Sequence, residues 1–361
     1  MFNDILISFG LNVSEYTIQP FGSGLINHTF KISNVNQAYI LQQINDSVFK
    51  HPGHIDSNLA LIKQYLDETS PGYLFVAPLK SQTGKSIIQS ADGKFYRMFP
   101  FIEGSHTVNF LQDTREAYSA AVQFGRFTRL LNNFDINKLE YTLPDFHNLK
   151  LRFSQFEQAL QTADDEKLKQ ADDEIKKARG YIAILHTYNK FTANSEIKLR
   201  VIHHDTKINN VLFDDRQNAL CLVDLDTVMP GYYLSDVGDM MRTYLSPANE
   251  EEKDLGKIVI RTDFFRAIYK GYMSEMGTIL TEAEKKYFIF SGEMMIYMQG
   301  LRFLTDFLNN DIYYGAQYEG HNLIRAKNQF KLLEGYINAG PLFKDIITGV
   351  DKELLATTND I

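Results

Sequence analysis

The first hundred residues alternate hydrophobic and polar positions over short stretches, which is the pattern of β-strands. YTIQPFGSGLINHTFKIS predicts two strands joined by a glycine turn, and QAYILQQI predicts a third. KSIIQSADGKFYRMFPFIEG predicts two more strands joined at Asp92-Gly93, a dipeptide typical of tight hairpins. Between these strands, HIDSNLALIKQYLDE carries apolar residues at helical spacing. This region is expected to form a small, mostly antiparallel lobe with one helix.

Beyond this lobe the apolar residues recur at intervals that indicate helices. Asp113 is a good helix cap, and Glu116 three positions later completes a capping box. The stretch 255–340 also has a helical pattern and is rich in Phe, Tyr and Met, which we expect mainly in the core. The boundary falls near FPFIEGS, so we predict an α+β chain with an N-terminal lobe over residues 1–102 and a larger, mainly helical lobe over 103–361.

Composition and charge narrow the classes of function. The chain has 361 residues, of which 44% are hydrophobic and 23% charged, as in ordinary globular proteins. A net charge of -8 argues against a nucleic-acid partner, which would require a basic face. Cys221 is the only cysteine, which excludes a disulfide framework. There is no basic leader and no run of roughly 18 apolar residues, so we expect a cytoplasmic protein without a membrane partner.

The stretch VIHHDTKINNVLFDDRQNALCLVDLDTV places ionisable and amide side chains between apolar strands. Burying such groups is costly unless a partner compensates them. The pattern predicts a hairpin with its turn at DDRQN, which would bring Asp205 and Asn210 close to Asp224 at the end of the second strand. Oxygen ligands without sulfur favour Mg²⁺, which binds through few carboxylates together with substrate phosphates. We therefore expect a magnesium site at this hairpin.

The same residues resemble the catalytic loop of kinases, His-x-Asp-x-x-x-x-Asn followed by an aspartate on a later strand. The matching positions are His203, Asp205, Asn210 and Asp224. The resemblance implies that Asp205 accepts the proton of a substrate hydroxyl, and that Asn210 and Asp224 hold Mg²⁺ against the phosphates of ATP. It also implies that Lys207 neutralises the transferred phosphoryl group and that His203 supports the loop.

The segment after this loop lacks the Asp-Phe-Gly and Ala-Pro-Glu marks of protein kinases. Instead, DLDTVMPGYYLSDVGDMMR resembles the aminoglycoside phosphotransferase and choline kinase superfamily. That resemblance implies a bilobal protein-kinase-like fold, in which Asp236 ties down the catalytic loop and FGSGLINHTFKI forms the nucleotide loop. The candidate phosphate-binding residues of that loop are Gly22, Ser23, Gly24, Asn27 and Thr29.

Longer segments are similar to the N-acetylhexosamine 1-kinases, a subgroup of this superfamily. They are FHNLKLRFSQF, DTKINNVLFD and QGLRFLTDFLNNDIYYGAQYEGHNLIRAKNQFKLLE. The similarity implies that ATP phosphorylates a sugar hydroxyl, namely the anomeric hydroxyl of an N-acetylhexosamine. The candidate contacts with this small-molecule acceptor are His28, Arg302 and Tyr314. For Arg302 the competing interpretation is an ion pair with Asp306, one helical turn further on.

One part of the superfamily pattern is missing. The third strand usually carries a cation that pairs with the α- and β-phosphates, whereas AYILQQI offers only Gln42 or Gln43. The following helix offers Asp56 in place of the usual glutamate partner of that cation. Either the glycine loop and Mg²⁺ suffice, or another cation reaches the phosphates.

Three other functions are compatible with the sequence. In the same fold, the acceptor could be an amino alcohol such as choline, or an aminoglycoside. LVDLDTV also matches the Asp-x-Asp motif of haloacid-dehalogenase phosphatases, with Asp224 as nucleophile and Asp226 as acid/base. The missing cation is consistent with a pseudokinase that binds nucleotide without turnover. The sequence does not determine the oligomeric state.

Overall fold

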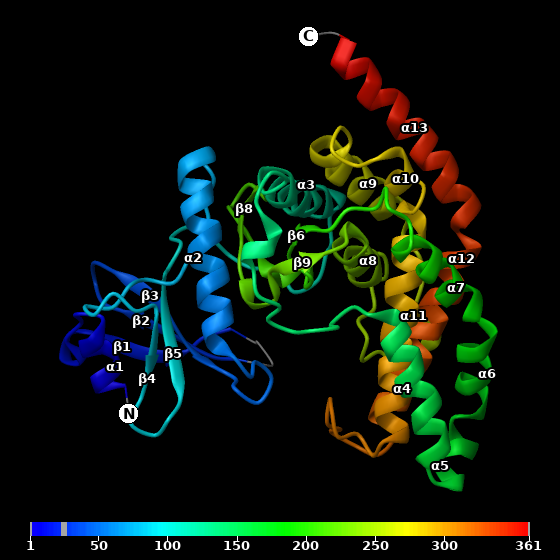
Figure 1. The fold of residues 1–361 in the computed structure, drawn as a ribbon, viewed down its shortest axis with the longest axis horizontal. Helices are drawn as coiled ribbons and strands as arrows, with labels where there is room; N and C mark the ends of the chain where they lie inside the picture. Colours follow the sequence, from blue (N-terminus) through cyan, green and yellow to red (C-terminus); the bar gives the residue numbers. More distant parts are fainter. Residues whose placement is uncertain (1, 23–26, 360–361) are drawn as a thin grey trace.

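The computed structural model describes residues 2–22 and 27–359 and consists of a β-sheet part and a larger helical part (Figure 1). The antiparallel sheet has five strands in the order β1-β2-β3-β5-β4, with a short helix α1 (Asn3–Ser8) beside it. Its strands are β1 (Thr17–Pro20), β2 (His28–Ser33), β3 (Ala38–Ile44), β4 (Ile87–Gln89) and β5 (Phe95–Pro100). The predicted α+β fold class is confirmed.

The register of this sheet places one row of polar residues across three strands. Gln42 of β3 lies opposite Thr29 of β2 on one side and opposite Arg97 of β5 on the other. Residues directly opposite one another in antiparallel strands point to the same face. The turn between β4 and β5 contains Gly93 with φ +81°, a conformation that glycine tolerates best, as the predicted hairpin requires.

The hydrophobic core has two clusters. The smaller one lies against the sheet and consists of Ile5, Leu6, Ile32, Leu41, Tyr96 and Met98. The larger one fills the helical part, and α2 (Pro52–Thr69) buries Ile55, Leu59 and Ile62 in it. Figure 1 shows α2 between the sheet and the helices. The helix that follows the third strand therefore packs with the C-terminal part, and the lobe boundary at residue 102 stays a prediction.

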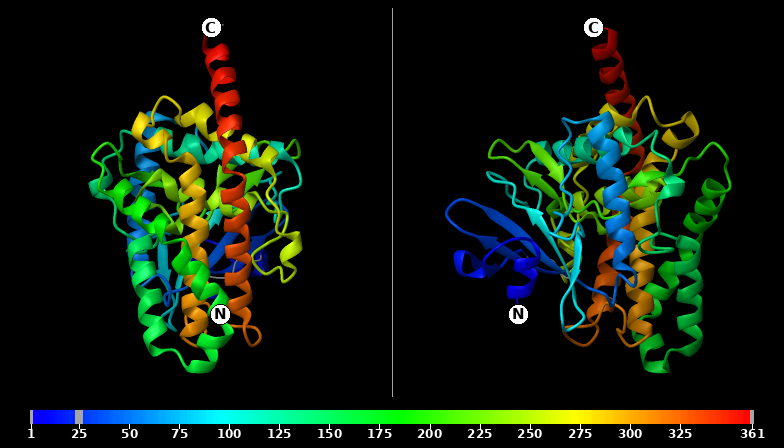
Figure 2. Two further views of the ribbon diagram at one scale, coloured as in Figure 1. Left: turned by 90° about the vertical axis from the view of Figure 1, so that its right-hand side faces the viewer. Right: turned by 60° about the vertical axis from the view of Figure 1, so that its left-hand side comes forward.

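The helical part surrounds two small antiparallel ladders. These are β6 (Arg200–Ile202) with β9 (Met229–Gly231), and β7 (Val211–Phe213) with β8 (Ala219–Leu222). The helices are α3 (Thr114–Leu130), α4 (Leu149–Thr162), α5 (Asp165–Gln170), α6 (Asp172–Gly180), α7 (Ile182–Thr192), α8 (Tyr233–Tyr244), α9 (Thr262–Met276), α10 (Glu282–Lys285), α11 (Phe288–Leu308), α12 (His321–Asn338) and α13 (Gly340–Asn359). The predicted capping box of Asp113 and Glu116 is present at α3. The C-terminal end of α13 projects from the body (Figure 2).

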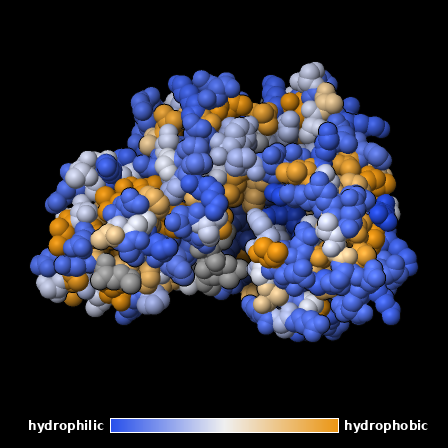
Figure 3. All heavy atoms as spheres, turned by 60° about the horizontal axis from the view of Figure 1, so that its bottom comes forward, coloured by the Kyte–Doolittle hydropathy of each residue, from blue (hydrophilic) through white to orange (hydrophobic). Residues whose placement is uncertain are grey.

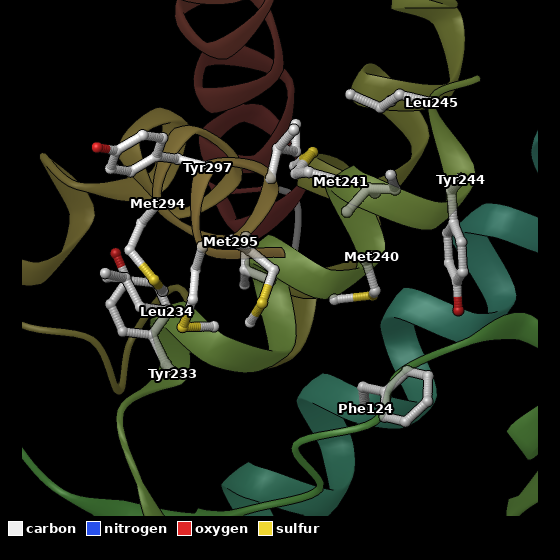
Figure 4. Close-up of a cluster of buried hydrophobic side chains, with 14 of the residues drawn as sticks. Phe124, Tyr233, Leu234, Met240, Met241, Tyr244, Leu245, Met294, Met295 and Tyr297 are labelled. Carbon is white, nitrogen blue, oxygen red and sulfur yellow. The ribbon is translucent and has the colours of Figure 1, made fainter. Parts of the chain in front are cut away.

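Helix α8 packs against α11 at backbone distance. A Cβ at Gly238 would lie 2.3 Å from the carbonyl oxygen of Ser291, so only glycine permits this approach. The contact is lined by Met240, Met241, Met294 and Met295 (Figure 4). All four side chains are buried, and α8 is thereby fixed beside the ladders.

The surface is hollowed between the sheet and the helical part, and hydrophilic residues lie in the hollow (Figure 3). Within the described ranges, no helix is both long enough and apolar enough to cross a membrane.

Candidate active site

The catalytic loop, residues 203–210, leads from β6 to β7 and is anchored by α8. The carboxylate of Asp236 accepts hydrogen bonds from the backbone N–H groups of His203 at 3.0 Å and His204 at 2.7 Å. Burial raises the pKa of Asp236 to about 7, and the two N–H groups act in the opposite direction. The predicted structural role of Asp236 is confirmed by these bonds.

The imidazole of His203 supports the loop from within. Its Nε2 lies 3.0 Å from the carbonyl oxygen of Val223, and its Nδ1 accepts the backbone N–H of Asp205 at 3.3 Å. Burial lowers the pKa of His203, which favours the neutral ring that one donor and one acceptor nitrogen require. Further along, Asp239 of α8 accepts the N–H of Thr206 at 2.9 Å. The backbone is therefore held on both sides of Asp205.

His204 is the strained residue of the loop. Its φ of 68° lies in the left-handed region, a conformation that costs about 1–3 kcal/mol for a bulky residue. The ring is only 5% exposed, and a Cβ at Gly231 would lie 2.4 Å from its Nε2. Burial lowers the pKa of His204 to about 3. The bond from its N–H to Asp236 stabilises this strained conformation.

Asp205 is an ionised carboxylate beside a cation. Lys207 Nζ lies 3.5 Å from Asp205 Oδ1, and the Nδ2 of Asn210 donates to the Asp205 carbonyl oxygen at 2.9 Å. Burial opposes ionisation of Asp205, but the charges of Lys207 and Arg242 are among the influences that outweigh it and lower its pKa. At neutral pH the Asp205 carboxylate can therefore accept a proton.

Asp224 lies where the β7–β8 hairpin meets the catalytic loop. The N–H of Val223 donates to the carbonyl oxygen of Asn210 at 2.9 Å, which holds Asp224 next to the loop. Asp224 itself has φ 57° and precedes a short 3-10 turn, η4 (Leu225–Thr227). The Asp224 side chain is exposed, and the protein atoms around it, followed by the charges of Asp226 and Asp205, raise its pKa. The structure thus brings together the three residues that the kinase pattern implied.

The donor atoms at this position fit Mg²⁺. Among the described residues, the Asp224 carboxylate and Asn210 Oδ1 have no hydrogen-bond partner, so both remain available as oxygen ligands. A divalent cation would also offset the repulsion between Asp224 and the neighbouring carboxylates of Asp226 and Asp205. The described residues hold no cluster of three or more His, Cys, Asp or Glu side chains with metal-binding geometry. A site with few protein ligands completed by phosphates agrees with that finding.

The predicted nucleotide loop lies only partly within the described residues. Ser23 and Gly24 lie outside the described residues. Gly22 is exposed and has φ +78°, as expected for a glycine turn. His28 begins β2 and is also exposed, and no hydrogen bond or ring contact in the described structure links it to the other two candidate acceptor residues.

Two predicted phosphate-binding residues make contacts within the protein instead. Asn27 Nδ2 donates to Asp226 Oδ2 at 2.8 Å, and the Thr29 hydroxyl accepts from Gln42 Nε2 at 3.2 Å. These side chains connect the nucleotide loop to the sheet and to the segment after Asp224. Their role toward a phosphate stays a prediction.

Arg97 of β5 is a buried cation that the sequence analysis did not single out. Its side chain is 1% exposed, and Nη2 lies 2.5 Å from Asp226 Oδ1. Nε and Nη2 donate to Gln42 Oε1 at 3.2 and 2.9 Å. Strand β3, which in the family pattern carries the cation that pairs with the phosphates, has Gln42 at this position. Arg97 of the neighbouring strand β5 contacts Gln42. The available signal was a lone arginine in the apolar stretch FYRMFP.

A second group of side chains lies beside His204. We call it the acceptor wall, and it consists of Phe146, His147, Arg152, Arg302 and Tyr314. The rings of Phe146 and His147 stack at 4.3 Å, and the His147 ring lies 5.6 Å from that of His204. The Arg302 guanidinium lies 5.4 Å from the Phe146 ring and 5.3 Å from the Tyr314 ring. Two of the three candidate acceptor residues therefore come together near the catalytic loop.

Among the described residues, Arg302 has only neutral hydrogen-bond partners. It donates to Gln299 Oε1 at 3.1 Å and to the Tyr313 hydroxyl at 3.3 Å. The competing pairing with Asp306 is wrong, because that carboxylate accepts the backbone N–H groups of Tyr313 at 2.7 Å and Tyr314 at 2.8 Å. Asp306 shapes the loop that carries the tyrosines and leaves Arg302 uncompensated.

Polar atoms of the acceptor wall lack partners. Arg152 donates to two backbone carbonyls and to Gln155, but its buried Nε has no acceptor. The buried Nδ1 of His147 is also without a partner. Burial, followed by neighbouring His204 and Arg302, lowers the pKa of His147 well below its usual value. In the described part of the chain, neither Arg152 nor Arg302 has a carboxylate within salt-bridge distance.

A small sheet beside a helical part, with an acid–amide–acid group between them, defines a kinase-like phosphotransferase. Residues 17–258 match the model of the APH family, described as the phosphotransferase enzyme family. The match covers more than half of the chain, and the chain belongs to this family. It is therefore a small-molecule kinase. The phosphatase alternative also fails on geometry, because Asp226, its acid/base, is bound by Arg97 and Asn27.

Solved structures of kinases share this fold over nearly the whole chain. A microcompartment-associated aminopropanol kinase is 15% identical with a TM-score of 0.62, covering 93% of this chain and 97% of its own. A spectinomycin phosphotransferase, in complex with ADP and spectinomycin, is 13% identical with a TM-score of 0.59, covering 93% and 96%. A choline kinase from Cryptosporidium parvum is 16% identical with a TM-score of 0.55, covering 93% and 94%. At these identities the similarity shows the fold alone.

Proposed function

We propose that this kinase transfers the γ-phosphoryl group of ATP to a sugar hydroxyl, namely the anomeric hydroxyl of an N-acetylhexosamine, with Mg²⁺ as cofactor. The segments similar to N-acetylhexosamine 1-kinases motivate the choice of sugar. The observation that carries it is the acceptor wall, where two guanidinium groups without carboxylate partners stand among aromatic rings.

The charge of the acceptor wall favours a neutral, hydroxyl-rich acceptor over an amine. A cationic acceptor would be repelled by Arg152 and Arg302, and it would need a free carboxylate. Two nearby carboxylates are engaged: Glu250 pairs with Arg242 and Arg325, and Asp306 accepts backbone N–H groups. Sugar hydroxyls and an acetamido carbonyl are acceptors for guanidinium N–H groups, and an aromatic ring offers an apolar surface to a sugar ring.

The proposed chemistry uses few protein groups. Asp205 takes the proton of the acceptor hydroxyl while the oxygen of that hydroxyl forms a bond to the γ-phosphorus. The bond between the γ-phosphorus and the β,γ-bridging oxygen breaks, and ADP is released. Lys207, 3.5 Å from Asp205, is placed to offset the charge of the transferred group. Bound Mg²⁺ would supply neutralisation of the phosphate charge, with Asp224 and Asn210 as its protein ligands.

A coupled ADP-release assay tests the acceptor class. Purified protein with Mg-ATP is offered N-acetylglucosamine, N-acetylgalactosamine, their parent sugars, choline, ethanolamine and an aminoglycoside at matched concentrations. We expect turnover with the N-acetylhexosamines, and ³¹P NMR of the product should show a sugar 1-phosphate. A sugar with its anomeric oxygen methylated is the matched control and should be inert.

Two outcomes would contradict the proposal. If choline, ethanolamine or the aminoglycoside is phosphorylated and no sugar is, the acceptor is a cation and the proposed neutral acceptor is wrong. Turnover with the methyl glycoside would keep the sugar but move the phosphoryl group to another hydroxyl.

A further inference from the structure

The third strand lacks the phosphate cation of the family pattern, and the sheet supplies a cation beside that position. Gln42 of β3 and Arg97 of β5 are register partners, so their side chains share one face. Neighbouring strands are about 4.8 Å apart, a distance that an arginine side chain spans easily. The contacts of Arg97 Nε and Nη2 with Gln42 Oε1 show that it does so.

Only some nitrogens of the Arg97 guanidinium have partners among the described residues. Nε and Nη2 donate to Gln42, and Nη2 lies 2.5 Å from Asp226 Oδ1, whereas the buried Nη1 has no hydrogen-bond partner among the described residues. Buried N–H donors without acceptors are uncommon because desolvation is then uncompensated. The planar guanidinium group matches phosphate oxygens well, and Nη1 is the nitrogen of Arg97 that is left to pair with one.

Asp226 orients this guanidinium toward the metal segment. Its Oδ1 contacts Arg97, its Oδ2 accepts from Asn27 at the end of the nucleotide loop, and it stands two residues after Asp224. Asp226 thus takes the place of the helix glutamate that usually holds the cation, and Asp56 has no such contact among the described residues. The arrangement places the positive charge of Arg97 close to Asp226, which also contacts Asn27 and follows Asp224 in the chain.

We propose that Arg97 is the cation that contacts the α- and β-phosphates of the nucleotide, with Asp226 and Gln42 as its positioning residues. This inference rests on the proposed use of ATP. Nη1 is the atom that gains phosphate oxygens, while Nη2 keeps its contact with Asp226. The competing interpretation is a purely structural ion pair that ties the sheet to the helical part.

The test separates these roles by the number of phosphates on the ligand. Dissociation constants of adenosine, AMP and ADP, with Mg²⁺ present, are measured by calorimetry without any acceptor. In Arg97→Met/Asp226→Asn, which removes both charges together, ADP affinity should fall about 10- to 100-fold, the range for a charge-assisted hydrogen bond, with adenosine affinity unchanged. Arg97→Lys, which keeps the charge, should lose less ADP affinity and leave adenosine unaffected.

The chain offers a matched control. Arg200 and Glu284 form another buried pair, 3% and 0% exposed, in contact at 2.5 Å. Arg200→Met/Glu284→Gln should lower thermal stability but leave the ratio of ADP to adenosine affinity unchanged. Equal losses of adenosine and ADP affinity in either Arg97 variant, or no loss of ADP affinity in the double variant, would overturn the assignment. If the wild type binds no nucleotide, the proposed use of ATP falls and the role of Arg97 with it.

Discussion

The catalytic loop and the acceptor wall lie next to each other but differ in how much of their polar surface is paired within the protein. In the loop, Asp236 and Asp239 of α8 accept hydrogen bonds from three backbone N–H groups, and both ring nitrogens of His203 have hydrogen-bond partners. In the wall, a nitrogen of His147 and one of Arg152 are buried without partners. The backbone of the loop is thus held by protein groups, although the buried Nδ1 of His204 has no partner among the described residues. In the wall, two side chains have unpaired nitrogens.

This difference agrees with the roles that we propose for the two regions. A catalytic base needs a fixed position, because misplacement by about 1 Å can cost about 10²-fold in rate. A binding surface needs unsatisfied donors, which reject ligands that cannot pair with them. The strained φ of His204 lies where the two regions meet, and the Asp236 carboxylate stabilises it from the loop side.

The sharpest test of the loop is removal of its base. Asp205→Asn keeps the shape of the side chain but cannot accept the substrate proton. Turnover should fall about 10²- to 10⁴-fold, the usual contribution of a general base, while ADP affinity stays within about 2-fold of wild type. Steady-state kinetics and calorimetry on the same preparation check both parts. If the variant kept nearly full turnover, Asp205 would not be the general base.

The next largest effect is expected from the loop anchor. Asp236→Asn replaces one acceptor oxygen with an NH₂ group that faces a backbone N–H. Leaving that buried donor unpaired should lower the free energy of unfolding by about 1–3 kcal/mol. Turnover should fall about 10²-fold because Asp205 loses its position. Chemical denaturation and kinetics measure the two effects, and a stability loss with unchanged turnover would contradict the anchoring role.

Sequence reasoning was sufficient for the parts of the site that local spacing determines. The spacing from Asp205 to Asn210 and the hairpin up to Asp224 are local. The capping box of α3 is local in the same sense. The five-stranded sheet and the helical part were predicted for the same reason, since each element carries its own periodicity. The anchor Asp236, 33 positions from His203, was implied by the family resemblance.

The sequence did not indicate contacts that depend on strand order and on long-range packing. Arg97 meets Gln42 because β5 pairs with β3, although 55 positions separate the two residues. The acceptor wall joins Phe146, His147 and Arg152 to a distant helix and loop, and no periodicity indicates that contact. The packing of α2 with the helical part likewise depends on tertiary contacts such as those of Asn58.

The acceptor wall is tested by removing one of its charges. Arg302→Met keeps an apolar stem but removes the donors, and the KM for the acceptor should rise about 10-fold with the KM for ATP unchanged. The exposed Arg179, which pairs with Glu157, provides the control, because Arg179→Met should change neither constant. An unchanged acceptor KM would mean that Arg302 only shapes the loop with Tyr313.

The smallest effect concerns the junction between the two regions. Glu250 contacts Arg242 Nη1 at 2.8 Å and also pairs with Arg325, whose guanidinium lies 5.1 Å from the Tyr314 ring. Burial opposes ionisation of Glu250, but the charges of Arg242 and Arg325 outweigh it and lower its pKa from 4.5 to about 2. Because the folded state holds this carboxylate ionised more strongly than the unfolded state does, Glu250 stabilises the fold above about pH 4.5.

We expect Glu250→Gln to lower the free energy of unfolding by about 1 kcal/mol at pH 7. The difference from wild type should shrink as the pH falls below about 4.5 toward 2, since the wild-type carboxylate is then progressively neutralised. Urea unfolding from pH 7 down to pH 3.5 measures this trend, and Glu157→Gln, which removes an exposed charge, should show no difference at any pH. If the difference in unfolding free energy between the variant and wild type stays constant down to pH 3.5, Glu250 acts through its shape. The charge of Glu250 then does not link the catalytic loop to the acceptor wall.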